Sequence, residues 1–204
     1  MLHYATRLLH YGLVSTPTVD PRIERTRRVV LAAAADVIAR HGFSRATIDA
    51  IATRSGVARS TIYRNWNGRM ELLLEAVQAR FGPVGGVAVG EVRQDLLALC
   101  RHLANLLTEE PTASIAASLI LESRRDPSLQ ALHRRFADGR IRAIADVVEA
   151  AKARGELRLA PAGATVAMDL GAAIFFRAMV LRVPIEPDWL EAHVDDCLER
   201  YGTD

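Results

Sequence analysis

The sequence contains few of the residues that mark several classes of protein. Cysteine occurs twice in 204 residues, and neither Cys100 nor Cys197 has a second cysteine or a histidine at metal-ligand spacing. This pattern argues against a disulfide framework and a zinc site, and it fits a reducing compartment. No apolar run approaches the roughly 18 uncharged residues that a membrane span requires. We therefore expect a soluble cytoplasmic protein without a membrane segment or a bound metal.

The first 20 residues lack the marks of a targeting signal. Their leucines are interrupted by His3, Arg7 and His10, and no small-residue cleavage site follows. We interpret residues 1–20 as a flexible N-terminal extension or the product of a start site placed too early.

Aromatic residues are scarce, and no stretch alternates cleanly between apolar and polar residues. Aromatics make up 5% of the chain, whereas alanine and leucine together supply 57 of the 204 residues. This composition favours helices over strands. Half of the residues are hydrophobic, so the chain can bury a core as one large domain or two small ones.

Lysine is almost absent, and charge is distributed unevenly. Lys152 is the single lysine, and the net charge of the whole chain is only +2. Residues 22–80 carry 11 basic and 5 acidic side chains, whereas residues 81–204 carry 14 and 18. A basic N-terminal third joined to an acidic remainder suggests a module that binds a polyanion, attached to a body of another kind.

Apolar spacing predicts about nine helices and no sheet. Caps and glycine stops place them near residues 21–41, 47–55, 59–66, 69–77, 92–107, 111–122, 127–153, 163–183 and 187–201. The run Gly82-Pro83-Val84-Gly85-Gly86 interrupts this pattern and predicts a domain break near residues 81–90.

Residues 47–66 contain two short helices joined by a turn at Ser55-Gly56-Val57, which is helix-turn-helix spacing. The residues expected to pack inward are Ile48, Ile51, Ala52, Val57, Ile62 and Trp66. The outer face of the second helix keeps Arg59, Ser60, Thr61, Tyr63, Arg64 and Asn65. Such guanidinium, hydroxyl and amide groups suit base edges and phosphate oxygens.

The segment from Arg27 to Val77 resembles the N-terminal domain of TetR-family transcriptional regulators. The resemblance rests on Ala33-Ala34, His41-Gly42-Phe43, Thr47-Ile48, Ile51-Ala52, Ser55-Gly56-Val57, Ser60-Thr61-Ile62-Tyr63-Arg64, Trp66 and Leu72-Leu73, all at the family's spacing. It implies an all-α homodimer, with a DNA-binding domain at residues 21–80 and a helical ligand-binding and dimerisation domain at residues 91–204.

The resemblance also assigns roles to individual residues. It implies phosphate contacts by Thr47, Tyr63 and Arg69, base contacts by Arg59, Ser60 and Thr61, and contacts to bases or backbone by Arg64 and Asn65; Arg45 is a further expected DNA contact. Ala58 departs from the family, which usually has Ser or Thr there to cap the recognition helix. The alternatives are that Tyr63 packs on the domain, Thr47 is an ordinary cap and the arginines form a solvated face.

The second domain shows no catalytic motif, so we expect neither an enzyme nor a cofactor. Polar residues beside its apolar stripes that could orient a ligand are Arg101, His102, Glu122 and Arg177, and Phe136 and Phe176 are candidates to line a cavity. Small or apolar residues near the end of the chain predict a dimer interface, for which the candidates are Gly171, Phe175, Trp189, Val194 and Leu198. The same stripes could instead only close the core of the monomer.

These features predict a repressor that binds a palindromic operator as a dimer and is released by a small-molecule inducer. Two recognition helices about 34–36 Å apart would enter successive major grooves, and a ligand could change that spacing. An activator or a constitutive regulator without a ligand remains an alternative. A third hypothesis is an all-helical enzyme or carrier with an incidental helix-turn-helix.

Overall fold

The computed structural model describes residues 21–82, 90–157 and 160–202, and these residues form nine α-helices, one π-helical turn and no strand. The all-helical prediction is therefore confirmed. The predicted extension at residues 1–20 and most of the predicted glycine-rich break lie outside the described residues.

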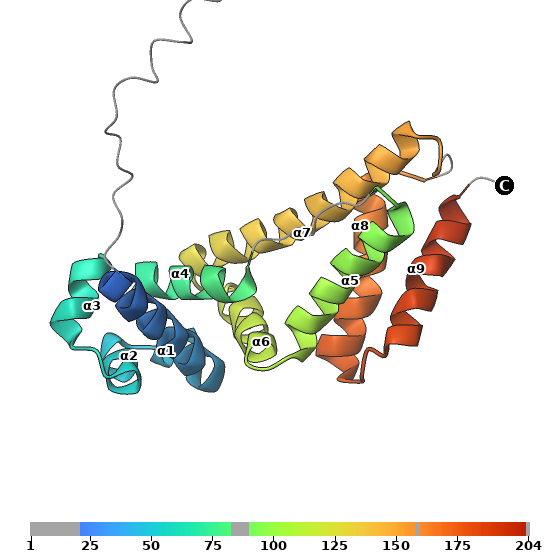
Figure 1. Ribbon diagram of the computed structural model, residues 1–204. Coiled ribbons are helices and arrows are strands. Elements are labelled where there is room, and N and C mark those ends of the chain that lie inside the picture. The colour runs from blue at the N-terminus through green and yellow to red at the C-terminus, as the bar shows by residue number, and fades with distance from the viewer. Residues whose placement is uncertain (1–20, 83–89, 158–159, 203–204) are drawn as a thin grey trace, which may run out of the picture.

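Four helices form the N-terminal end of the molecule (Figure 1): α1 (Pro21–Arg45), α2 (Ile48–Ser55), α3 (Arg59–Asn65) and α4 (Arg69–Phe81). Their core is fully apolar, with Val30, Ile38, Ile51, Ile62 and Leu73 at 0% exposure. The α-helical conformation of α1 is interrupted at Gly42, which has φ 76° and ψ 171°. This interruption coincides with the predicted helix end at His41-Gly42.

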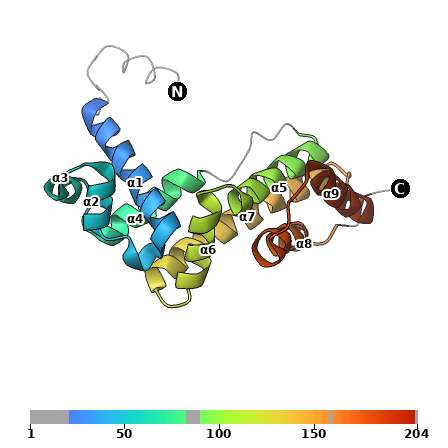
Figure 2. The same cartoon turned by 90° about the horizontal axis from the view of Figure 1, so that it is seen from below.

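The remaining helices form a bundle: α5 (Val92–Thr108), α6 (Thr112–Glu122), α7 (Pro127–Ala153), α8 (Gly163–Phe175) and α9 (Pro187–Tyr201). The long helix α7 packs closely along α8. A Cβ atom at Gly163 would lie 2.7 Å from the Ala145 carbonyl oxygen, so only glycine permits this approach. Figures 1 and 2 show α1–α3 at one end and α8 and α9 at the other, joined by α4, α6 and α7.

The helix predicted over 163–183 is observed over Gly163–Leu181, and its last part is π-helical. After α8 the chain makes the π-helical turn η1 (Phe176–Leu181), which ends where Arg182 adopts a left-handed conformation with φ 55°. The segment Gly163–Leu181 is 19 residues long with mean hydropathy 1.7, so by length and composition it could cross a membrane.

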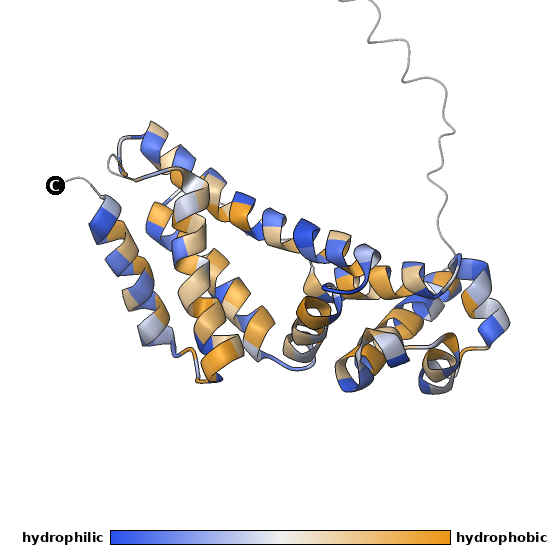
Figure 3. Cartoon of the chain, turned by 180° about the vertical axis from the view of Figure 1, so that it is seen from behind, coloured by the Kyte–Doolittle hydropathy of each residue, from blue (hydrophilic) through white to orange (hydrophobic). Residues whose placement is uncertain are grey.

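The two charged residues of this segment are held by α9. The Tyr201 hydroxyl donates to the Asp169 carboxylate at 2.9 Å, and the Arg177 guanidinium lies 4.4 Å from the centre of the Trp189 ring. Only 22% of the segment is buried in the single chain, and Figure 3 shows the largely hydrophobic colouring of α8. Within the part of the chain that the structure describes, its apolar face is therefore largely uncovered.

Candidate DNA-binding surface and effector cavity

Local capping and packing fix the geometry of α2 and α3. The Thr47 hydroxyl accepts a hydrogen bond from the Ala50 N–H at 3.2 Å at the start of α2. Gly56 ends α2 in a left-handed conformation, and its N–H donates to the Ala52 carbonyl at 2.9 Å. Ile62, on the inner face of α3, is fully buried. The residues predicted to face inward thus belong to the core or pack against it, with Ala52 and Val57 half-buried, and one face of α3 is left free.

The free face of α3 is polar. Tyr63 is 58% exposed, and Arg59, Ser60 and Arg64 are also exposed. The Arg59 guanidinium pairs with the Asp49 carboxylate at 2.8 Å, with both side chains largely in water. Exposed pairs of this kind contribute little, so Arg59 is free to exchange Asp49 for another acceptor.

Two of the predicted contact residues are partly engaged within α3. The Arg64 Nη2 atom donates to the Thr61 hydroxyl at 3.0 Å, and the Asn65 amide donates to the Thr61 carbonyl at 2.8 Å. Thr61 and Asn65 are half-buried. Asn65 therefore turns toward its own helix, whereas Arg64 remains at the surface.

Arg69, for which the resemblance implied a phosphate contact, also makes a contact within the protein. Its Nη1 atom donates to the Phe43 carbonyl at 2.6 Å, and the side chain is half-buried. It ties the start of α4 to the turn between α1 and α2. Arg45 and Thr47, on that same turn, are exposed.

The end of α3 is held by a second polar anchor. The Trp66 indole N–H donates to the Glu75 carboxylate at 2.8 Å, and Arg27 Nε donates to the other Glu75 oxygen at 2.9 Å. The Arg27 guanidinium also lies 5.0 Å from the centre of the Trp66 ring. Helices α1, α3 and α4 are thereby fixed to one another, which holds the exposed face of α3 rigidly.

Glu122, a possible ligand contact in the sequence analysis, connects the bundle to α1. Its two carboxylate oxygens accept hydrogen bonds from the N–H groups of Phe43 and Ser44, at 2.8 and 2.9 Å. The Ser118 hydroxyl donates to the same carboxylate at 2.7 Å. A Cβ atom at Gly42 would lie 2.8 Å from Glu122 Oε1, so glycine is needed here both for its backbone conformation and for this close approach.

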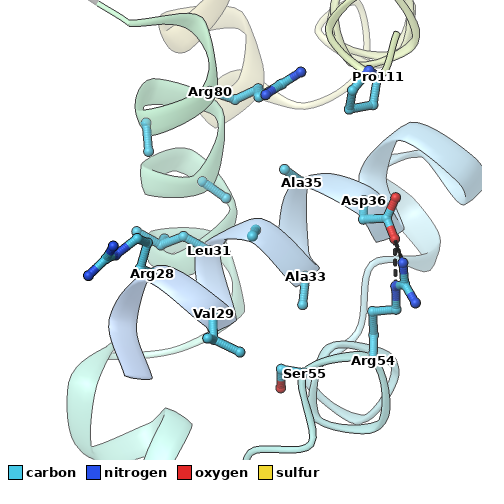
Figure 4. Close-up of a pocket in the computed structure, with 13 residues that line it drawn as sticks. Arg28, Val29, Leu31, Ala33, Ala35, Asp36, Arg54, Ser55, Arg80 and Pro111 are labelled. Carbon is cyan, nitrogen blue, oxygen red and sulfur yellow. Dashed lines mark hydrogen bonds and ion pairs between the residues drawn. The ribbon is translucent and has the colours of Figure 1, made fainter. Parts of the chain in front are cut away.

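A surface cleft of about 510 Å³ runs along the junction of the two regions, between α1, α2, α4 and the start of α6. Figure 4 shows Asp36 and Arg54 paired on one side of it, with Arg80 and Pro111 on the other. Arg80 Nε donates to the Thr112 hydroxyl at 3.1 Å. Burial raises the pKa of Asp36, but hydrogen bonds and charge from Arg54 and Arg40 outweigh it and lower that pKa overall.

A smaller apolar cavity of about 190 Å³ lies between helices of the bundle and is partly open to the surface. It is bounded by the end of α4 and by α5, α6 and α7. Phe81 and Phe136 form its aromatic wall, with ring centres 4.8 Å apart. Leu103, Leu119 and Ile141 are among its aliphatic lining residues. Arg140 also lines it, with a guanidinium 5.6 Å from the centre of the Phe81 ring and 5.5 Å from that of Phe136.

The four predicted ligand residues do not share this cavity. Phe136 lines it, and His102 precedes the lining residue Leu103, with an Nε2 atom that is buried without a hydrogen-bond partner in the described structure. Phe176 is 51% exposed on the outer face, and Arg177 donates to the Pro184 carbonyl at 3.0 Å. Sequence reasoning missed Arg140, although it lies one turn after Phe136 on an apolar stripe.

The predicted dimer residues divide between the core and the surface. Phe175 is 39% exposed, whereas Val194 is 1% exposed and fills the core of the single chain. Gly171 faces α5, since a Cβ there would lie 3.7 Å from Leu103. Trp189 stacks on His193 with ring centres 5.1 Å apart, and Leu198 is half-buried. On α8 and η1 the exposed large apolar residues are Met168, Phe175, Phe176, Val180 and Leu181.

The fold and the polar face of α3 define a helix-turn-helix protein joined to a helical bundle, and comparisons with known proteins identify the family. The profile described as "Bacterial regulatory proteins, tetR family" matches residues 30–76, and "Tetracyclin repressor-like, C-terminal domain" matches residues 88–197. The chain belongs to the TetR family of DNA-binding transcriptional regulators, which are not enzymes.

Individual relatives agree with this assignment. An HTH-type transcriptional regulator of Mycobacterium tuberculosis is 29% identical over 174 residues, which cover 83% of this chain and 84% of the relative. The DNA-binding transcriptional repressor TetR of Mycobacteroides abscessus is 26% identical over 180 residues, covering 87% and 94%. A regulator from Saccharomonospora viridis, solved in complex with choline, superposes with a TM-score of 0.69 at 22% identity, covering 89% of this chain and 99% of that one.

Proposed function

We propose that this protein is a homodimeric transcriptional repressor that binds a palindromic operator through α3 and leaves it when a small molecule occupies the bundle cavity. The observation that carries the proposal is the division of α3 into a buried apolar face at Ile62 and an exposed face of Arg59, Tyr63 and Arg64. A helix presenting such donors suits the major groove. The cytoplasm, where the chromosome lies, is the matching location.

The exposed face of α8 and η1 supports the homodimer. Met168 is 61% exposed, Phe176 51% and Val180 56%. Apolar surface of this kind at one end of a helical bundle is typical of a contact between subunits. A second copy of the same face would cover it and would place two α3 helices on one DNA molecule.

Helix α6 offers a path from the cavity to the DNA-binding helices. Ala116, Leu119 and Ile120 line the cavity, and Glu122, at the end of the same helix, holds the N–H groups of residues 43 and 44. A ligand that displaces α6 would therefore move the C-terminal end of α1, which leads into α2. Such a shift alters the orientation of α3 without any contact between ligand and DNA.

Binding of the full chain to palindromic DNA from its own promoter region tests the proposal. Fluorescence anisotropy should show an affinity that falls steeply with salt, because phosphate contacts release counterions. The double variant Arg59→Ala/Tyr63→Ala should weaken binding by about 2–6 kcal/mol if each residue contributes about 1–3.

The matched control is Arg134→Ala/Arg135→Ala, which removes two exposed arginines of α7 and should leave the affinity nearly unchanged. Binding that persists in the Arg59/Tyr63 variant, or that does not depend on salt, would contradict the proposed operator surface.

A further inference from the structure

Arg140 is half-buried in the bundle, and two of its three guanidinium nitrogens have no hydrogen-bond partner among the described residues. Its Nη1 atom donates to the Phe136 carbonyl at 3.0 Å. Its Nε and Nη2 atoms are shielded from solvent and have no hydrogen-bond partner among the described residues. Burial lowers the pKa of Arg140 to about 10, yet the group stays charged near neutral pH. Leaving the buried donors of a cation unsatisfied lowers the stability of the folded chain. The position of Arg140 in an apolar wall therefore needs an explanation.

The Nε and Nη2 atoms form the edge of the guanidinium that matches the two oxygens of a carboxylate. Four other arginines of this chain use that same edge for a carboxylate, one of them Arg54 with Asp36. Arg27 pairs in this way with Glu75, Arg93 with Asp195, and Arg154 with Glu156. Arg140 differs from them because its edge has no acidic partner among the described residues and its side chain lines the bundle cavity.

The lining of the cavity favours a negative ligand. None of its described lining residues is acidic, and its ionisable residues are Arg140 and His133. The charge of Arg140 also reaches His102 on α5, where it adds to burial in lowering the histidine pKa. The His102 Nε2 atom is a second buried polar atom without a partner in the described structure.

The rest of the cavity sets the size and polarity of the ligand. The volume of about 190 Å³ is lined by Phe81, Phe136 and aliphatic side chains and is partly open to the surface. An apolar protein cavity of about 150 Å³ holds a benzene ring, so this one accommodates a single ring or a short alkyl chain. The guanidinium lies against the two aromatic rings, which directs an anionic head group to one side of the cavity.

We propose that the effector of this protein is a compact apolar molecule bearing one carboxylate, which the Nε and Nη2 atoms of Arg140 bind inside the bundle. The inference rests on the proposed function, because it names the chemical class that the regulatory cavity takes. The fold alone does not decide this class, since one structural neighbour is described in complex with choline, a cation, and another with stearoyl-CoA, an anion.

The test uses full-length protein and pairs of probes that differ only in charge: benzoate with benzamide, phenylacetate with phenylacetamide, and hexanoate with hexanamide. Isothermal titration calorimetry should find at least one carboxylate that binds about tenfold or more tightly than its amide, because hydrogen bonds to charged groups are the stronger ones. Equal binding within every pair, or no binding of any carboxylate, would overturn the inference.

Two variants locate the effect. Arg140→Met keeps the length and apolar stem of the side chain and should abolish the preference for the carboxylate. Arg135→Met is the matched control, since Arg135 also lies near the Phe136 ring but is exposed, and it should bind like the wild type. Without any probe, Arg140→Met should melt at the same or a higher temperature, because it removes two buried donor atoms that have no partner among the described residues. A lower melting temperature would assign Arg140 to structure rather than to ligand binding.

Operator binding measured in the same samples separates this inference from the proposed function. Carboxylate binding that leaves the DNA complex intact would support the inference and contradict release by an inducer. Release of DNA by the amides but not by the carboxylates would support an inducible repressor and overturn the assignment to Arg140.

Discussion

The two ends of this molecule are built from similar helices but expose opposite chemistry. At the N-terminal end the apolar side chains are buried, and α3 exposes Arg59, Tyr63 and Arg64. At the other end α8 and η1 expose Met168 and Phe176, whereas the bundle buries the charged edge of Arg140. The first surface suits a phosphate backbone, and the second suits another protein surface. The two ends have similar helix content. They differ in whether the exposed side chains are polar or apolar, and this difference distinguishes the two functions.

The largest expected effect concerns the exposed apolar face. Phe176→Glu should separate the proposed dimer, because the substitution occurs in both subunits and each buried phenylalanine contributes about 1.5–3 kcal/mol. We expect dimer dissociation to rise about 100-fold or more by sedimentation velocity, together with loss of tight operator binding. Leu121→Glu changes a residue that is 68% exposed on α6 and should leave the dimer intact. Equal dissociation of both variants would contradict an interface on α8.

The contact between the two regions comes next. Gly42→Ala should lower the free energy of unfolding by about 3 kcal/mol or more, since it combines a backbone conformation largely confined to glycine with displacement of the Glu122 carboxylate. Gly56→Ala is the matched control, because Gly56 has φ 70° but no atom within 4 Å of the added Cβ. It should cost about 1–2 kcal/mol. Chemical denaturation measures both, and equal losses would mean that Glu122 contributes nothing.

A smaller effect is expected from pH on the free energy of unfolding, and it should arise from His102 in the bundle. Burial, and then the charge of Arg140, lower the pKa of His102 in the folded chain. Below the unfolded pKa of about 6.5, the unfolded chain therefore binds a proton more readily than the folded chain, and stability falls as the pH drops. His102→Gln should reduce this loss between pH 7.5 and 5.5, by at most about 1.4 kcal/mol per pH unit. Parallel pH curves for the two proteins would contradict the prediction.

The smallest effect is a gain at the DNA-binding end. Ala58 precedes α3 in an extended conformation and makes no side-chain cap. Ala58→Ser should supply an acceptor for the free N–H groups of the first turn and stabilise the protein by about 0.5–1 kcal/mol. Thermal unfolding would show a higher midpoint, whereas an unchanged or lower midpoint would show that the hydroxyl does not reach those groups.

Local sequence signals predicted the helices well, because each helix carries its own caps and apolar spacing. Thr47 and Gly56 bound α2 as expected, and the helix predicted over 127–153 is α7. The π-helical turn after Phe175 escaped prediction, since it continues the same apolar composition as α8. The DNA-contact residues stay a prediction, although the exposure of Arg59, Ser60, Tyr63 and Arg64 is compatible with it.

Contacts between helices distant in the sequence were the part that could not be predicted. Glu122 lies 79 residues from Phe43 and holds its N–H, and Arg69 reaches back to the Phe43 carbonyl. Val194 was a candidate interface residue because it belongs to an apolar stripe on α9. Packing within the single chain buries it. Periodicity identifies an apolar face without specifying what covers it.

The sequence by itself determined the helical class, the helix-turn-helix and the basic character of the N-terminal third, because these depend on neighbouring residues and on composition. Only the tertiary structure decided that Glu122 joins the two regions, that Arg140 lines the bundle cavity, and that Phe176 faces outward. These three placements depend on how α1, α6, α7 and α8 pack against one another. A side chain's environment is set by its neighbours in space, which helix spacing alone does not specify.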